Sequence, residues 1–173
     1  ITILSPNTLL PITKNYDTPE TLGADRLAAA VGASVVFPNE NCLIIDLGTC
    51  IKYDFVENGN VFQGGIIGPG LRMRFKAMHQ FTKKLPLIEE IEPWPALIGK
   101  STIQAMKSGV LNGMLAEMSG IIAEYEALLT KFKIILCGGD ASFFESRLKK
   151  PTFVVPGLVP LGLNKILFHN IEQ

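Results

Sequence analysis

The chain has 173 residues, of which 47% are hydrophobic and 18% are charged, which is enough apolar material for a packed core and excludes a wholly disordered protein. Sixteen Lys and Arg residues balance sixteen Asp and Glu residues, which argues against a nucleic-acid partner held by bulk positive charge. The longest uncharged runs are shorter than the roughly 18–20 residues that a membrane-spanning helix needs. We therefore expect a globular protein with neither a nucleic-acid nor a membrane partner.

The start of the chain and its cysteines indicate the compartment. No basic segment followed by an apolar run opens the sequence, so no signal peptide is visible. The three cysteines are an odd number without CxxC spacing, which is typical of reduced thiols in a cytosolic protein.

The first residue, Ile1, is not a methionine. We therefore expect this chain to be a piece of a longer protein.

The first part of the chain predicts one helix between short strands. An Ala-rich segment over Leu22–Val31 favours a helix, which Gly32 is expected to end. The Asn58-Gly59 pair between two strand-like runs is a strong hairpin signal. The expected strands are Ile1–Leu4, Cys42–Leu47, Ile51–Val56 and Val61–Ile67.

The second part of the chain predicts mainly helices. The longest pattern runs from about Ser101 to Leu129, where apolar residues recur every three or four positions. Gly109, Gly113 and Gly120 weaken this helix, and close packing at a subunit interface is one explanation for them. The other expected elements are helices at Leu71–Phe81, Ala141–Leu148 and Leu158–Ile171 and strands at Lys133–Cys137 and Phe153–Val155. This order predicts an α/β fold in which helices flank a mixed β-sheet.

Three strand ends lead into glycine-rich or polar turns, where open α/β sheets bind ligands. Backbone N–H groups of such glycines can approach an anion closely. A carboxylate such as Asp46 can hold a cation there, although it could equally cap a turn. The turns are Asp46–Thr49, Gly64–Gly70 and Cys137–Asp140, and none has the GxxxxGK[ST] or GxGxxG pattern.

Asp25 and Arg26 lie in the first half of an otherwise apolar helix. The simpler interpretation is an acid that favours the helix dipole next to a surface arginine. The sharper interpretation is a general base beside an anion-binding guanidinium. His79 and His169 lie far apart without a ligand partner at suitable spacing, which argues against a histidine metal site.

Taken together, these segments resemble the type III pantothenate kinase family. The resemblance covers nearly the whole chain, and it rests on seven motifs in family order. They are the run from Tyr16 to Arg26 ending in GADR, IIDLGT at Ile44–Thr49, GGIIGPGL at Gly64–Leu71, Leu85-Pro86, GKST at Gly99–Thr102, CGGDA at Cys137–Ala141 and GLVPLGLN at Gly157–Asn164.

The resemblance implies a fold and an activity. It implies the actin-like, ribonuclease H-like fold of the acetate kinase, sugar kinase, Hsp70 and actin superfamily, with two domains facing a nucleotide cleft. It implies phosphorylation of pantothenate by ATP to 4'-phosphopantothenate, the first step of coenzyme A synthesis. It further implies Mg²⁺, a monovalent cation (K⁺ or NH₄⁺), a homodimer and a cytoplasmic location.

The resemblance also implies roles for single residues. Asp25 would be the base that takes the proton from the pantothenate hydroxyl. Asp46 would hold the monovalent cation. The pantothenate site would comprise Tyr16, Gly23, Ala24, Asp25, Arg26 and, across the dimer interface, Thr102, and the ATP site would comprise Thr49, Gly138 and Gly139.

The chain departs from the family pattern at its start, because the DxGNT-type phosphate motif that precedes GxDR is not in it. We therefore expect residues 1–33 to be the remnant of a first actin-like domain and residues 34–173 to form the second. We also expect this piece to be inactive alone. Two alternatives remain, namely a catalytically inactive regulatory or accessory relative, and a superfamily phosphatase that would not need Asp25.

Overall fold

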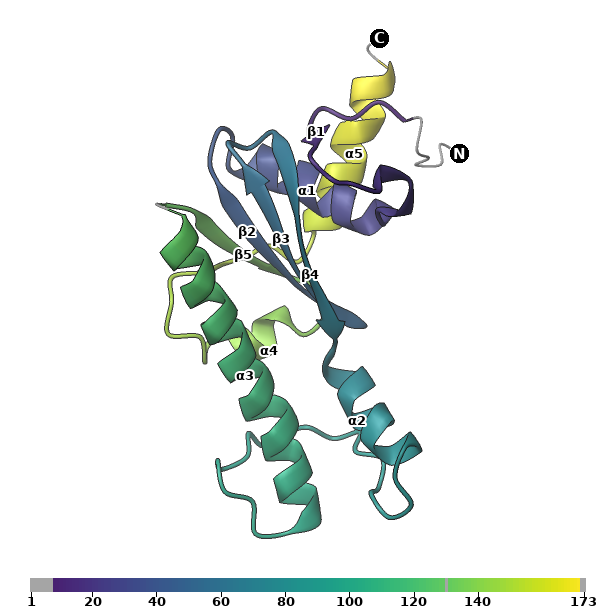
Figure 1. Ribbon diagram of the computed structural model, residues 1–173, viewed down its shortest axis with the longest axis vertical. Helices are drawn as coiled ribbons and strands as arrows, with labels where there is room; N and C mark the ends of the chain where they lie inside the picture. Colours follow the sequence, from purple (N-terminus) through teal and green to yellow (C-terminus); the bar gives the residue numbers. More distant parts are fainter. Residues whose placement is uncertain (1–7, 130, 172–173) are drawn as a thin grey trace.

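The computed structural model describes residues 8–129 and 131–171, so the strand predicted at Ile1–Leu4 lies outside the described residues. The elements follow one another as a mixture of strands and helices, which confirms the predicted α/β class (Figure 1). They are β1 (Thr13–Lys14), the 3₁₀ turn η1 (Pro19–Thr21), α1 (Ala24–Val36), β2 (Cys42–Leu47), β3 (Cys50–Glu57), β4 (Val61–Pro69), α2 (Leu71–Gln80), α3 (Thr102–Leu128), β5 (Lys133–Cys137), α4 (Ala141–Glu145), β6 (Phe153–Val154) and α5 (Leu158–Ile171).

Within the described residues, six strands form one sheet in the order β1-β4-β3-β2-β5-β6. β2, β3 and β4 are antiparallel neighbours, whereas β5 pairs in parallel with both β2 and β6. The mixed sheet is therefore confirmed. Asn58 and Gly59 adopt positive φ angles of 48° and 67°, as the predicted hairpin turn requires.

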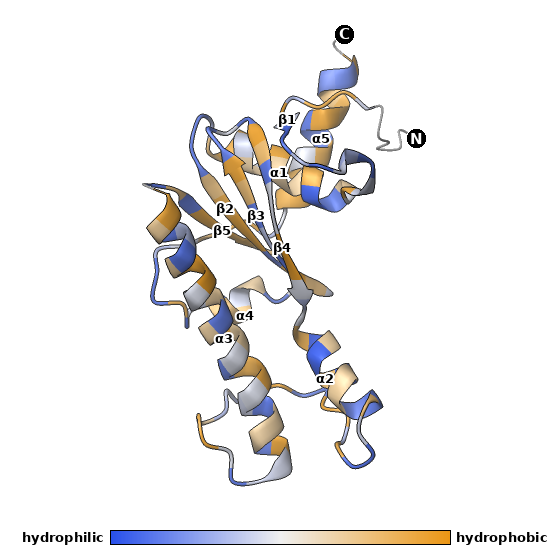
Figure 2. Ribbon diagram, viewed as in Figure 1, coloured by the Kyte–Doolittle hydropathy of each residue, from blue (hydrophilic) through white to orange (hydrophobic). Residues whose placement is uncertain are grey.

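Helices cover both faces of the sheet (Figure 1). Side chains that alternate along β2 and β3 point to opposite faces, and each face has its own apolar cluster. Leu43, Ile45 and Tyr53 pack with α2, α3 and α4, whereas Cys42, Ile44 and Val56 pack with α1 and α5. Figure 2 shows the apolar colouring along the central strands that results from this double coverage. None of the described helices is long and apolar enough to cross a membrane.

The closest helix contact lies between α1 and α5, and it corrects one prediction. Gly32 does not end a helix, because α1 continues to Val36. A Cβ atom on Gly32 would lie 2.3 Å from the backbone oxygen of Leu158, and one on Gly162 would lie 1.7 Å from that of Ala28. These glycines therefore permit close helix packing. The predicted domain boundary after residue 33 falls within α1 and stays a prediction.

One other helix end differs from the prediction. The helix expected to reach Leu148 ends at Glu145. The backbone N–H of Arg147 then bonds to the carbonyl of Phe144 three residues back, so the chain tightens into a turn of 3₁₀ type.

Gly162→Ala should destabilise the fold, because the new methyl group would meet the α1 backbone at Ala28. We expect the free energy of unfolding in urea to fall by about 1–3 kcal/mol or more. Gly157→Ala is the matched control, since no atom of the described residues beyond its chain neighbours lies within 4 Å of the added carbon. That variant should change the free energy of unfolding by less than about 1 kcal/mol. Equal unfolding midpoints for the two variants would contradict the close α1–α5 contact.

Candidate active site

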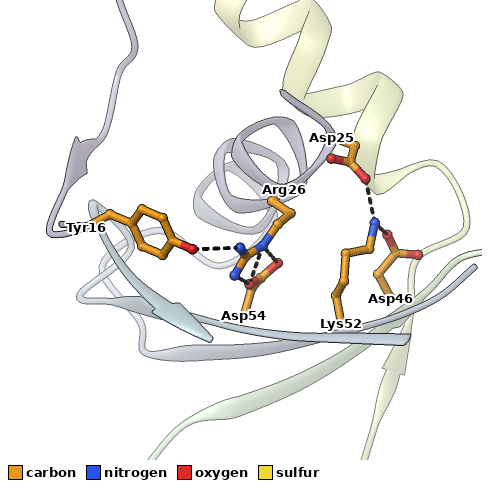
Figure 3. A network of polar contacts seen from close by, with 6 residues as sticks. All are labelled: Tyr16, Asp25, Arg26, Asp46, Lys52 and Asp54. Carbon is orange, nitrogen blue, oxygen red and sulfur yellow. Dashed lines mark hydrogen bonds and ion pairs between the residues drawn. The ribbon is translucent and has the colours of Figure 1, made fainter. Parts of the chain in front are cut away.

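The first turn of α1 and the middle of β3 form two adjacent ion pairs (Figure 3). Asp25 and Arg26 are consecutive on α1, while Lys52 and Asp54 are two residues apart on β3 and so share one face of the sheet. Asp25 contacts Lys52, and Arg26 contacts Asp54. Four charges therefore meet between the helix and the sheet in two complementary pairs.

The Arg26–Asp54 pair is buried, with the two residues only 5% and 2% exposed. The guanidinium donates from Nε and Nη2 to Asp54 Oδ1 at 3.0 and 2.5 Å. Its Nη1 donates to the Tyr16 hydroxyl at 3.4 Å, and its carbon lies 5.4 Å from the centre of the Phe62 ring. Burial raises the pKa of Asp54, although the charge of Arg26 opposes that shift. The pair holds Tyr16, α1 and β3 together.

Lys52 lies between two carboxylates. Its Nζ is 2.5 Å from Asp25 Oδ2 and 2.7 Å from Asp46 Oδ2, and Figure 3 shows the ammonium group between them. Lys52 pairs directly with Asp46 across the β2–β3 hairpin, where facing side chains are close neighbours. The hairpin register thus places the lysine beside Asp46, and the position of α1 adds Asp25.

The contact shifts the pKa values of both Lys52 and Asp25. Burial of Lys52 opposes its charge, but hydrogen bonds and charges of Asp25 and Asp46 outweigh burial and raise its pKa. Partial burial of Asp25 opposes ionisation, but the hydrogen bond and charge of Lys52 and the backbone N–H groups of Arg26 and Asp25 outweigh it, so its pKa is lowered. Asp25 is therefore an ionised carboxylate at neutral pH, as a proton acceptor must be.

Two of the predicted glycines make room for these carboxylates. A Cβ atom on Gly23 would lie 2.6 Å from Asp25 Oδ1. Gly138 has a φ of +86°, and a Cβ there would lie 2.6 Å from Asp46 Oδ1. Larger residues at these positions would push the carboxylates away from Lys52.

A separate cavity of about 500 Å³ lies beside the β2–β3 turn. Thr49 and Gly139, both predicted ATP contacts, line it together with Arg72 and Lys76 of α2. Asp140 also lines it, and burial raises the pKa of its carboxyl group, against the opposing charge of Arg72. Two cations beside a hydroxyl and a glycine suit an anionic ligand such as a phosphate chain.

Most of the predicted residues gather in this region, but one does not. Tyr16, Gly23, Ala24, Asp25, Arg26 and Asp46 surround the ion pairs, and Thr49, Gly138 and Gly139 follow at the neighbouring strand ends. Thr102 begins α3, whose first turn lies at the end of the molecule opposite α1 (Figure 1). Ser101 before it caps α3 by accepting a hydrogen bond from the Gln104 N–H at 3.3 Å.

Sequence reasoning missed four residues of the region. Lys52 and Asp54 were visible as two charges in an otherwise apolar strand, a pattern that indicates a polar function on one face. Arg72 and Lys76 were visible as cations one turn apart on the helix after the glycine-rich break. The signals were present, but their partners lie far away in the sequence.

The described residues could hold Mg²⁺, but they fit a monovalent cation at Asp46 poorly. Among residues 8–129 and 131–171, no three His, Cys, Asp or Glu side chains cluster to hold a metal ion. Mg²⁺ needs no such cluster, because it usually binds through phosphates and one or two carboxylates, and Asp140 offers a carboxylate in the cavity. A monovalent cation at Asp46 fits poorly, since the ammonium group of Lys52 already binds Oδ2 of that carboxylate.

Another cavity, of about 460 Å³, lies along α5. The described residues that line it, among them Pro160, Leu163 and Leu167, carry no ionisable side chain. These described residues offer no charged group to a phosphate.

Comparisons with known proteins agree with the motifs. The family model for type III pantothenate kinase matches residues 1–124. The chain is 51% identical over 168 residues to the type III pantothenate kinase of Cytophaga hutchinsonii, covering 97% of this chain and 71% of that protein. It is 47% identical to the type III pantothenate kinase of Flavobacterium johnsoniae, covering 95% of this chain and 67% of that protein.

A solved structure shares the fold. It is that of a Campylobacter jejuni protein described as a Baf family transcriptional activator, and it superposes with a TM-score of 0.66 at 23% identity. The match covers 98% of this chain and 72% of that chain, so the described arrangement of helices and strands occurs in a larger protein.

The buried ion pair can be tested by removing one partner. Asp54→Ala leaves the Arg26 guanidinium buried and unpaired, and we expect the free energy of unfolding to fall by about 3–5 kcal/mol. The double variant Arg26→Met, Asp54→Leu removes both charges and should lose less. Urea unfolding followed by circular dichroism measures both. A loss below about 1 kcal/mol for Asp54→Ala would contradict a buried pair.

Proposed function

Because the chain belongs to the type III pantothenate kinase family, we propose that it transfers a phosphoryl group from ATP to the hydroxyl of pantothenate. The product, 4'-phosphopantothenate, is the first intermediate of coenzyme A synthesis. The observation that carries the proposal is the ionised Asp25 at the start of α1, beside the buried Arg26, in a chain whose motifs and relatives are those of this family.

Asp25 is the proposed base. Its carboxylate is 54% exposed, so a substrate hydroxyl can reach it, and Lys52 orients its Oδ2. As the bond from the hydroxyl oxygen to phosphorus forms, the hydroxyl proton passes to Asp25, and the bond to the ADP oxygen breaks. Positioning and charge neutralisation then supply most of the catalysis.

The proposed pantothenate site is lined by Tyr16, Gly23, Ala24 and Arg26. Asp54 holds Nε and Nη2 of Arg26, which leaves Nη1, beside the Tyr16 hydroxyl, as the donor for the carboxylate of pantothenate. Arginine suits this role because it binds carboxylates with directed hydrogen bonds.

The proposed ATP site is the cavity beside Thr49. Thr49 and Gly139, which line the cavity, suit phosphate oxygens, and Arg72 and Lys76 supply positive charge. Gly138 is the residue next to Gly139 and is proposed to contact ATP as well. Mg²⁺ bound to the phosphates, with Asp140 near, would neutralise charge on them. The Asp46-to-Thr49 hairpin connects this cavity to the Asp25 side, so both substrates can meet at the turn.

A homodimer through α3 is part of the proposal. Ala105, Gly109, Gly113, Ala116 and Gly120 form a stripe of small, exposed residues along α3, and no atom of the described residues beyond the helix itself lies within 4 Å of a Cβ on its three glycines. Such a stripe lets another helix approach closely. Thr102, at the start of α3, would then reach the partner's pantothenate site. A cytoplasmic location suits Cys42, Cys50 and Cys137, which are all free.

Replacing the base tests the proposed reaction. Asp25→Asn in the native protein should lower kcat for transfer from radiolabelled ATP to pantothenate by about 10²–10⁴, with the KM for ATP little changed, because the ATP cavity is separate. Asp17→Asn, an exposed aspartate outside the site, is the matched control. Full activity in Asp25→Asn would instead favour chemistry that does not need this base.

A bulky residue on the small-residue stripe tests the dimer. Gly113→Leu should convert the native protein to monomers in size-exclusion chromatography with light scattering, while its circular dichroism is unchanged, because the position is exposed. Lys165→Leu, exposed on α5, which packs on the opposite face of the sheet from α3, should leave the dimer intact. A dimer that persists in Gly113→Leu would exclude this face as the interface.

A further inference from the structure

Lys52 occupies the carboxylate at which the family resemblance implies a K⁺ or NH₄⁺ ion. We propose that the ammonium group of Lys52 takes the place of that ion, so that this protein carries its monovalent cation as part of its own chain and needs none from solution. The inference rests on the proposed function and on the family resemblance, which implies that Asp46 holds the cation.

The hairpin register sets the position of the ammonium group. Asp46 and Lys52 are paired residues on adjacent antiparallel strands, so their side chains leave the sheet side by side on the same face. The resulting distance of 2.7 Å from Nζ to Asp46 Oδ2 is that of a charge-assisted hydrogen bond. Lys52 is only 13% exposed, so its ammonium is held in place and does not sample solvent freely.

The chemistry of the group matches that of the ion. A lysine side chain ends in a compact ammonium with three N–H donors and one positive charge, which makes it a tethered form of NH₄⁺. Two of its donors reach carboxylate oxygens, one of Asp46 and one of Asp25. A free cation on the same Asp46 oxygen would meet the like charge of Lys52 at close range, and so would be repelled.

Lys52 is the cation that neutralises Asp25 and Asp46 in this ion-pair network. Arg26, the nearest other cation of the network, is bound to Asp54 on its Nε and Nη2. Asp25 and Asp46 thus share one positive charge in the ion-pair network that Figure 3 shows. The lysine neutralises the proposed cation site and touches the proposed base with the same group.

Salt-dependent stability tests the inference on the chain itself, without any activity. Thermal unfolding is compared in KCl, NH₄Cl, NaCl and choline chloride at equal ionic strength. The unmodified chain should show equal Tm values in K⁺ and choline. Lys52→Ala, which vacates the position, should bind the ion, and K⁺ at about ten times its dissociation constant should then raise Tm by about 3–6 °C.

Two variants separate the ion from general charge effects. Lys52→Met removes the charge but fills the space, so it should respond to K⁺ less than Lys52→Ala does. Lys133→Ala removes a lysine from a surface pair with Glu40 and should show no K⁺ response. A K⁺-specific rise of Tm in the unmodified chain would overturn the inference, and so would a Lys52→Ala variant that ignores both K⁺ and NH₄⁺.

Transfer from ATP to pantothenate by the native protein supplies the second readout. The unmodified protein should be as fast in choline chloride as in KCl, whereas Lys52→Ala should be slow in choline and recover with K⁺ or NH₄⁺. A native protein that transfers only when K⁺ is added would overturn the inference. Absence of transfer in every salt would count against the proposed function, while the Tm comparison would still decide the role of Lys52.

Discussion

The buried ion pair between Arg26 and Asp54 is the contact on which the candidate site depends. Neither charge could remain in the layer between α1 and the sheet without the other, because an unpaired buried charge is strongly destabilising. The pair therefore holds the first turn of α1 above the middle of β3. Asp25, the residue before Arg26, is thereby placed over Lys52, so a structural contact positions the proposed base.

The β2–β3 hairpin joins the two halves of the proposed chemistry. The side chain of Asp46, near the end of β2, contacts Lys52 beneath α1. Thr49, in the turn, lines the cavity together with Arg72 and Lys76. Only two residues separate them in the chain. A short, rigid connection of this kind suits phosphoryl transfer, which depends mainly on the relative placement of the two substrates.

Lys52 has two effects on the site that oppose each other. Its charge keeps Asp25 ionised and lowers the pKa of that carboxyl group, which also makes Asp25 a weaker base.

A cation supplied by the chain is always present, whatever the ionic composition around the protein. Covalent attachment also removes the entropic cost of binding a free ion, because the hairpin register already places the ammonium beside Asp46.

The sequence alone determined most of the secondary structure, because the signals for it are local. The apolar run Cys42–Leu47 and the Asn58-Gly59 turn predicted the strand and hairpin that the structure contains, and the 3.6-residue periodicity predicted α3. The motifs also indicated the family correctly. Gly32 was misinterpreted because its partner, Leu158, lies on a distant helix.

Only the tertiary structure decided which charges meet. Asp25 and Lys52 are 27 residues apart, and Arg26 and Asp54 are 28 apart, so no local pattern connects them. Their pairing required both the register of β3 against β2 and the position of α1 on the sheet. The sequence could name Asp25, Arg26 and Asp46 as candidates, but the long-range contact with Lys52 exists only once the helix has packed on the strands.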